Sequence, residues 1–217
     1  MHSGFDTIVS RRAVMGAALA VTAGAMASPA SATVTLTTGM GQTANPVRPV
    51  LLRRALEALH VHGHRIPHRD RIAIADFTAP SSRQRFHFVD LANGRTTSLL
   101  VAHGSGSDPE HTGWLQQFSN QPGSNASSSG AFVTSDYYSG KHGRSQRLIG
   151  LDRTNDNALS RAIVIHGAWY AAPEMIEKHG MLGRSQGCFA VGEQSLDEVF
   201  ARLGEGRLLY ADKLESA

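Results

Sequence analysis

The only cysteine of this 217-residue chain, Cys188, lies in the segment 183-GRSQGCFA-190. A lone cysteine is either a small buried hydrophobic side chain or, beside a base and hydrogen-bond donors, a nucleophile. Gly187 allows a tight turn, so the backbone amides of Gln186, Gly187 and Cys188 can point at one developing oxyanion. Arg184 adds a positive charge that favours the thiolate. The segment therefore has the residue types that nucleophilic catalysis requires.

His166 is the candidate base. It ends the apolar run 162-AIVI-165 and is followed by Gly167, so it is expected at the edge of a buried strand. Such a histidine can face a loop cysteine if an acceptor orients its second ring nitrogen, and the carbonyl of Gly167 would serve. Each residue alone has a structural explanation, as a buried thiol or a strand-end hydrogen bonder. Their combination favours nucleophilic catalysis.

The elements that position these residues are expected to be mostly strands. Short apolar or alternating runs predict strands at 71–77, 84–91, 96–104, 131–138, 145–152, 161–167 and 207–211. Asn93-Gly94 between two of these runs predicts a hairpin, because this pair tolerates positive φ angles. Helices are expected from Pro46 to about Gly63, over 173–180, and over 195–203, where Ser195 and Glu198 form a capping-box pattern.

This pattern predicts a mainly β, α+β domain, an antiparallel β-sandwich or barrel with peripheral helices. No internal repeat and no βαβ alternation is present. The polar segment 119-SNQPGSNASSSG-130 is long for a loop inside a domain, and such loops often bind ligands.

The N-terminus has the order of an export signal. Arg11 and Arg12 precede an apolar run of about 15 small residues, and Ala30-Ser31-Ala32 offers a cleavage site. The run is shorter than the roughly 20 residues that span a bilayer, which favours a cleaved signal over an anchor. Ser10-Arg11-Arg12 also fits a twin-arginine signal. We predict a signal peptide at 1–32, a flexible lead-in at 33–45 and one domain at 46–217.

Composition narrows the possible partners. A net charge of +3 without any basic run argues against nucleic-acid binding. No later segment is long or apolar enough to span a membrane. One cysteine cannot form an internal disulfide, and in an exported protein a leftover thiol is functional, intermolecular or buried. The composition does not define the oligomeric state.

Several motifs occur together in a recognisable order. They are 103-HGSGS-107, 138-YSGKHG-143, 155-NDNA-158, 163-IVIHGAWY-170 and 183-GRSQGCFAV-191. Together they resemble the murein L,D-transpeptidase catalytic domain (YkuD-like), and more specifically its branch with a GRSxGC cysteine motif. The resemblance spans roughly residues 47–211.

The chain departs from the wider family at three points. The family has a histidine two residues before the cysteine, where this chain has Gln186, and an Asn or Arg two residues after it, where this chain has Ala190. The spacer of 18 residues between His166 and Ser185 is long for the family. A role that needs a second imidazole at position 186 therefore does not carry over, and whether His103 or His142 compensates is left open.

The resemblance implies a cysteine-dependent peptidoglycan L,D-transpeptidase. Cys188 would attack the third-residue carbonyl of a tetrapeptide stem, D-Ala would leave, and an amine would resolve the thioester as a 3→3 cross-link. His166 and Gly167 would complete the catalytic group, and we expect oxyanion or substrate contacts from Arg184, Ser185, Gln186, Gly187, Tyr138 and His103. No cofactor is implied, and the location would be the periplasm or cell envelope.

Other functions stay open. The same residues would also serve an L,D-carboxypeptidase or amidase, in which water resolves the thioester. A non-catalytic wall-binding protein is a further alternative, which the intact His166 and Cys188 pair disfavours. The segment 60-HVHGHRIPH-68 carries four histidines, the common zinc ligand, but lacks a paired carboxylate or cysteine, so we assign no metal.

Overall fold

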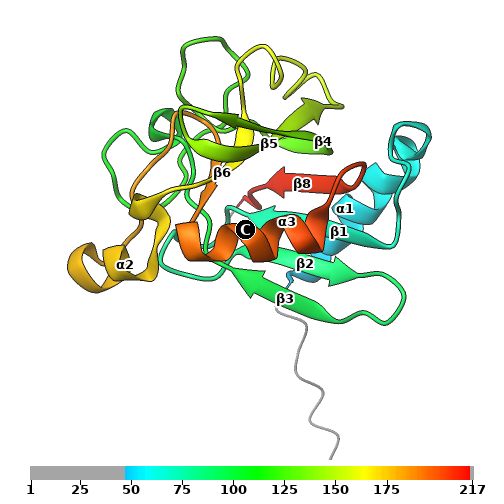
Figure 1. The fold of residues 1–217 in the computed structure, drawn as a ribbon, viewed down its shortest axis with the longest axis horizontal. Coiled ribbons are helices and arrows are strands. Elements are labelled where there is room, and N and C mark those ends of the chain that lie inside the picture. The colour runs from blue at the N-terminus through cyan, green and yellow to red at the C-terminus, as the bar shows by residue number, and fades with distance from the viewer. Residues whose placement is uncertain (1–46, 216–217) are drawn as a thin grey trace, which may run out of the picture. The chain divides into compact units, whose positions relative to one another are not determined.

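Eight strands form one mixed sheet in the computed structural model of the protein, which describes residues 47–215 (Figure 1). The strand order is β3-β2-β1-β8-β4-β5-β6-β7, and only β1–β8 and β6–β7 are parallel neighbours. The strands are β1 (Arg71–Asp76), β2 (Phe86–Asp90), β3 (Thr96–Leu99), β4 (Gly130–Gly140), β5 (Gly143–Gly150), β6 (Val164–Gly167), β7 (Phe189–Val191) and β8 (Leu208–Asp212).

Three α-helices accompany the sheet: α1 (Pro49–Val61), α2 (Pro173–His179) and α3 (Leu196–Leu203). α2 ends at Gly180, whose φ of +74° is the left-handed conformation that glycine adopts readily. The helix at 195–203 is confirmed, but its capping box is wrong. Ser195 already has helical torsion angles and makes no side-chain capping hydrogen bond, so the helix begins from a preceding 3-10 turn instead.

α1 and α3 cover opposite faces of the same strand. Side chains alternate between the two faces of a strand. In β1, Ala73 and Ala75 therefore belong to one core cluster, and Ile72 and Ile74 belong to another. The first cluster includes the buried face of α3, and the second includes that of α1. The centre of the sheet is thus buried on both sides.

The sheet contains two tight hairpins, one at its β3 edge and one in its interior. β2 and β3 pair across Asn93-Gly94, as the sequence predicts, and Gly94 has a φ of +71°. β4 and β5 pair as far as Gly140 and Gly143, which leaves a turn formed by Lys141 and His142. The second hairpin lies beside β6, and its tip bears on the site described below.

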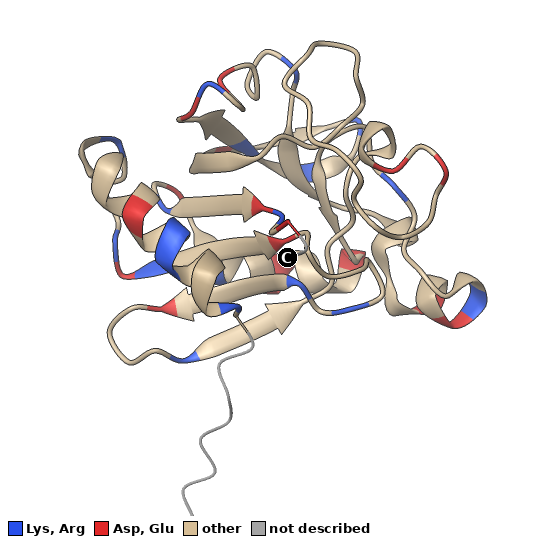
Figure 2. Ribbon diagram, turned by 180° about the vertical axis from the view of Figure 1, so that it is seen from behind, with Lys and Arg blue, Asp and Glu red and all other residues tan. Residues whose placement is uncertain are grey.

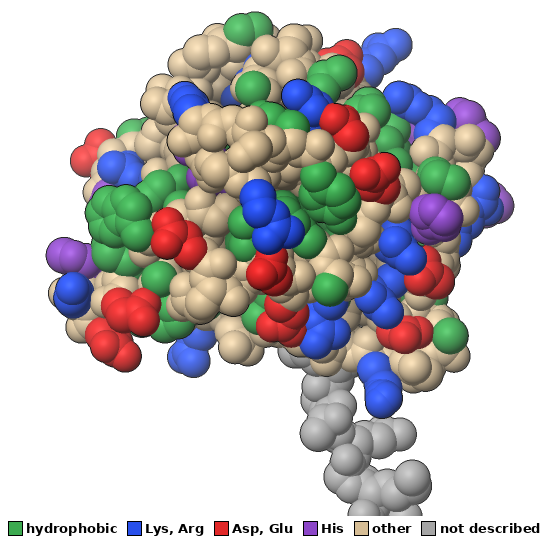
Figure 3. Space-filling view, in the orientation of Figure 1, with side chains coloured by type: hydrophobic (Ala, Val, Ile, Leu, Met, Phe, Trp, Pro, Cys, Tyr) green, Lys and Arg blue, Asp and Glu red, His purple; other side chains and the backbone are tan. Residues whose placement is uncertain are grey.

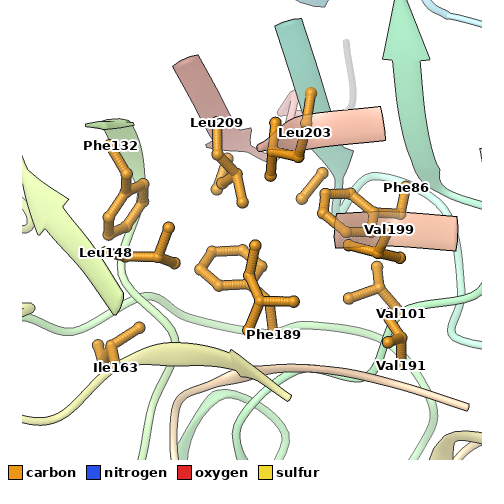
Figure 4. Close-up of a cluster of buried hydrophobic side chains, with 14 of the residues drawn as sticks. Phe86, Val101, Phe132, Leu148, Ile163, Phe189, Val191, Val199, Leu203 and Leu209 are labelled. Carbon is orange, nitrogen blue, oxygen red and sulfur yellow. The ribbon is translucent and has the colours of Figure 1, made fainter. Parts of the chain in front are cut away.

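The main core fixes β7 in place. Phe189 of β7 stacks on Phe77 with ring centroids 6.0 Å apart, and meets Phe132 of β4 edge-on at 5.5 Å. Figure 4 shows Phe189 between Phe132 and Leu148 on one side and Phe86 and Val199 on the other. Aromatic side chains of this size dominate core energetics, so the residue that follows Cys188 is firmly anchored.

The predicted fold class, mainly β with peripheral helices, is confirmed, and each predicted strand and helix overlaps an observed one. The sheet is mixed, however, and β7 was not expected from the sequence. The predicted signal peptide and lead-in lie outside the described residues. Within residues 47–215 no helix is long and apolar enough to cross a membrane. Acidic and basic side chains are interspersed on both views (Figures 2 and 3).

Candidate active site

Cys188 and His166 line the same cavity, which has a volume of about 800 Å³. Its walls come from the β4–β5 hairpin, the end of β6, the loop before β7 and the 119–130 loop. Its lining includes Tyr138, His142, His166, Arg184, Gln186 and Cys188.

The parallel pairing of β6 and β7 brings Cys188, the candidate nucleophile, near His166, the candidate base. His166 is paired with Ala190, and Ile165 with Phe189. Ile165 and Phe189 belong to the main core. Because side chains alternate along strands, His166 and Cys188 lie on the opposite face, which is the wall of the cavity. Ala190 lies on that face as well, where it is buried in a small apolar cluster with Ala102 and Ala168.

His166 is oriented as a base. Its Nδ1–H donates to the carbonyl of Gly167 over 2.9 Å, as the sequence suggested, which leaves the lone pair on Nε2. Burial lowers the pKa of His166, and the hydrogen bond to Gly167 raises it only partly. His166 is therefore a neutral imidazole near neutral pH, able to accept a proton.

Cys188 is a buried thiol, 8% exposed, with Sγ 3.5 Å from the carbonyl oxygen of Ala162. Burial raises its pKa, while the backbone of Val164 and the charges of Lys141 and Arg161 act in the opposite direction. The resting state is therefore a protonated thiol that needs a base to become a nucleophile.

The turn before Cys188 is clamped by Ser185. Ser185 Oγ donates to the Cys188 carbonyl over 2.7 Å and accepts the Gly187 amide over 3.1 Å. Gly187 has a φ of +112°, and a Cβ there would lie 2.8 Å from the carbonyl oxygen of Ala126, so only glycine fits. Because its amide is occupied, Gly187 is not a free oxyanion donor, contrary to expectation. The amides of Gln186 and Cys188 have no partner among the described residues.

The fold does not bring His103 to the cavity, so our expectation that it contacts substrate is not met. Its side chain is 1% exposed, with Nδ1 2.7 Å from Arg85 Nη2 and Nε2 3.4 Å from Asp108 Oδ2. Burial and the charge of Arg85 lower its pKa to about 3. Its backbone carbonyl accepts the amide of Ser185 over 2.9 Å. His103 therefore supports the turn before Cys188 through this backbone hydrogen bond.

The remaining predicted residues line the cavity. Arg184 donates to the backbone carbonyls of Asp108 and Pro109, which fixes its guanidinium at the rim. Tyr138 lies under Arg147, whose guanidinium carbon is 4.0 Å from the ring centroid. The side chain of Gln186 is exposed in the cavity.

Sequence reasoning missed Arg161 and Lys141 as cavity residues. Arg161 donates to the carbonyls of Ser119 and Ala126 and to two serine hydroxyls, so it holds the 119–130 loop against the cavity. The polar loop was the only signal in the sequence, because Arg161 lies in the turn before β6 and belongs to no recognisable motif. Lys141 belongs to the motif 138-YSGKHG-143, but no role was predicted for it from the sequence.

The histidine-rich segment forms no converging ligand set. His62 Nε2 lies 2.8 Å from Asp152 Oδ1. Residues 47–215 contain no group of three or more His, Cys, Asp and Glu side chains placed to hold one metal ion. His62 thus meets a single carboxylate and not a set of metal ligands.

Three comparisons with known proteins bear on the family. The model of the L,D-transpeptidase catalytic domain matches residues 43–211. No curated protein matches the chain. Solved structures do match. Among them are L,D-transpeptidases from Mycobacterium smegmatis and Mycobacterium tuberculosis, and the helical cell shape determining protein Pgp2 from Campylobacter jejuni.

These structures are distant from the chain. The first is 11% identical with a TM-score of 0.40 and covers 66% of this chain. The second is 12% identical with a TM-score of 0.42 and covers 66%, and the third is 12% identical with a TM-score of 0.42 and covers 75%. The chain spans 58%, 57% and 56% of their respective lengths. With TM-scores below 0.5, the assignment rests on the family model. That model matches most of the chain, which therefore belongs to the L,D-transpeptidase catalytic domain family.

Proposed function

We propose that this protein is a peptidoglycan L,D-transpeptidase that works through a thioester on Cys188. The observation that carries the proposal is the placement of Cys188 and His166 on one cavity wall, with His166 Nδ1 committed to Gly167 and Nε2 left as a base. A thiol, an oriented imidazole and nearby amides are the parts that acyl transfer requires.

Acylation begins when His166 Nε2 takes the proton of Cys188. The sulfur attacks the carbonyl carbon of the third, diaminopimelate residue of a tetrapeptide stem, and the negative charge moves to the carbonyl oxygen. The amides of Gln186 and Cys188 are available to stabilise that oxyanion, at about 3 kcal/mol per donor. His166 then returns the proton to the nitrogen of the departing D-Ala, which leaves a thioester on Cys188.

The thioester has two possible fates. An amine of a neighbouring stem attacks it to give a 3→3 cross-link and the free thiol, or water attacks it to give a tripeptide. The cavity geometry serves both, so L,D-carboxypeptidase or amidase activity is the alternative outcome of the same chemistry.

The charge of the cavity supports an anionic peptide as substrate. Its lining includes Lys141, Arg161 and Arg184 and no Asp or Glu. None of these three cations forms an ion pair with a carboxylate of the described residues. Stem peptides carry free carboxylates, which unpaired cations in a cavity attract.

Incubation of the protein with purified sacculi, followed by mass analysis of the products, tests this proposal. A 3→3 dimer indicates transfer, a tripeptide indicates hydrolysis, and Cys188→Ser should yield neither while keeping its fold. An unchanged product profile for Cys188→Ser would overturn the nucleophile assignment. A chelator should leave the activity unchanged. Absence of both products from the wild-type protein would instead favour a wall-binding protein.

The location follows from the substrate. Peptidoglycan lies outside the cytoplasmic membrane, so we propose that the protein acts in the periplasm or cell envelope. The predicted signal at 1–32 agrees with export, and comparison of the N-terminus of the protein before and after secretion measures whether it is cleaved.

A further inference from the structure

The tip of the β4–β5 hairpin lies directly on the candidate base. The imidazole of His142 stacks on that of His166, with ring centroids 4.4 Å apart and planes 23° from parallel. His166 is only 1% exposed although it lines the cavity, whereas His142 is exposed. One face of the base is therefore covered by a side chain whose own outer face meets solvent.

The sheet itself fixes this arrangement. Ser145 of β5 pairs with His166 of β6, and β4 pairs with β5 up to Gly140 and Gly143. The turn of Lys141 and His142 is thus held by the β4–β5 pairing and, through β5, by the β5–β6 pairing. Gly143 has a φ of +70°, which lets the chain reverse tightly just after His142, so that the His142 ring can lie on His166.

We propose that His142 is a positioning residue that holds the His166 imidazole in its productive orientation and keeps water from its face. This inference rests on the proposed roles of Cys188 and His166, but not on the identity of the substrate. It also gives this chain a second imidazole at the site, although Gln186 stands where the wider family has a histidine.

Stacking restricts what His142 can do. Hydrogen bonds of an imidazole lie in its ring plane, so two near-parallel rings stacked face to face do not exchange a proton directly. His142 therefore acts through the orientation and surroundings of His166, and not as a proton carrier.

Charges around the pair set the direction of any pH effect. Burial lowers the pKa of His166, and His142 and Lys141 lower it further by repelling its protonated form. Burial and Lys141 also lower the pKa of His142. The other titratable or charged groups around the cavity are Tyr138, Arg161, Tyr170, Arg184 and Cys188, and Glu193 packs behind Gly167. Removal of the His142 ring should therefore raise the pKa of His166.

Alkylation by iodoacetamide tests the inference without any peptidoglycan. The chain has one cysteine, so all label found by mass spectrometry reports on Cys188. We expect His142→Ala to slow labelling at pH 7 about tenfold, a part of the 100-fold or more that a complete general base contributes. The midpoint of the pH–rate curve should move to higher pH. His142→Phe should restore most of the rate, because it keeps the stacked ring.

A double-mutant cycle isolates the route of the effect. If His142 acts through His166, His142→Ala should change little in a His166→Ala background. His179→Ala, which removes an exposed histidine of α2, is the matched control and should label within about twofold of wild type. The proposal is wrong if His142→Ala labels at the wild-type rate, if His142→Phe is as slow as His142→Ala, or if the loss persists without His166. A protein that labels as expected but fails on sacculi would refute the proposed function alone.

Discussion

Two buried histidines of this chain are each followed by glycine, and their surroundings differ sharply. His103 and His166 are both 1% exposed, and burial lowers the pKa of both. His103 accepts from Arg85 at Nδ1 and lies near Asp108 at Nε2, so both nitrogens are used. His166 donates from Nδ1 to Gly167, and its Nε2 is left as a lone pair.

The difference separates a structural histidine, His103, from the candidate base, His166. The two residues are expected to be opposite tautomers, because the partner of Nδ1 is a donor in one case and an acceptor in the other. A histidine with two partners in the interior stabilises the fold, whereas one with a free nitrogen at a cavity can accept a proton. The following predictions test this contrast.

His166→Ala should reduce product formation from sacculi about 100-fold to 10,000-fold, because the general base is lost. The melting temperature should stay near that of wild type. His103→Ala is the matched variant, and we expect it to lower stability more than activity per folded molecule. Equal activity losses in the two variants at equal folded fraction would remove the distinction between them.

Arg85→Met should lower the free energy of unfolding by about 3 to 5 kcal/mol. Arg85 is fully buried and donates to the carbonyls of Ala79 and Val101 as well as to His103, so its removal leaves buried acceptors unpaired. Burial lowers its pKa to about 9, which still leaves it charged at neutral pH. Urea unfolding measures the loss, and a change below about 1 kcal/mol would contradict this account.

His103→Ala should cost about 1 to 3 kcal/mol, since it leaves Arg85 and Asp108 without their shared partner. His103→Gln can keep part of the hydrogen bonding and should lose less. The comparison of the two variants by thermal unfolding decides whether polar pairing or ring packing matters at this position.

Acidification should destabilise the protein through His103. Its pKa in the folded state is about 3, below the ordinary value of 6.5, so the unfolded chain binds a proton that the folded chain refuses. The contribution of His103 to the free energy of unfolding is fully present above about pH 6.5. It is lost as the pH falls toward 3, at up to about 1.4 kcal/mol per pH unit. Urea unfolding between pH 7 and 4 should show a shallower loss for His103→Gln than for wild type.

Gln186→His should have the smallest effect, within about 0.5 kcal/mol of stability. The Gln186 side chain is exposed and its position is beside the cavity, so a histidine can be accommodated. If His142 already supplies the second imidazole, the rate of product formation should change little. A large gain in rate would mean that position 186 needs the histidine of the wider family.

The strand pattern was accessible from sequence because it depends on local chemistry. Asn93-Gly94 predicted the β2–β3 hairpin because few pairs tolerate its torsion angles, and the predicted and observed strands overlap there. Alternation does not reveal partners, so the parallel pairs β1–β8 and β6–β7 were not predicted. β7 itself is three residues long, too short for a periodic signal.

The sequence by itself identified the candidate nucleophile and the candidate base, because a single cysteine in a Gly-rich turn and a histidine at the end of an apolar run have recognisable local chemistry. Tertiary structure alone decided that His103 is structural and that His142 covers His166. These roles depend on which side chains occupy the two nitrogens and two faces of each ring. Such partners lie far apart in the chain and are set only when the sheet is assembled.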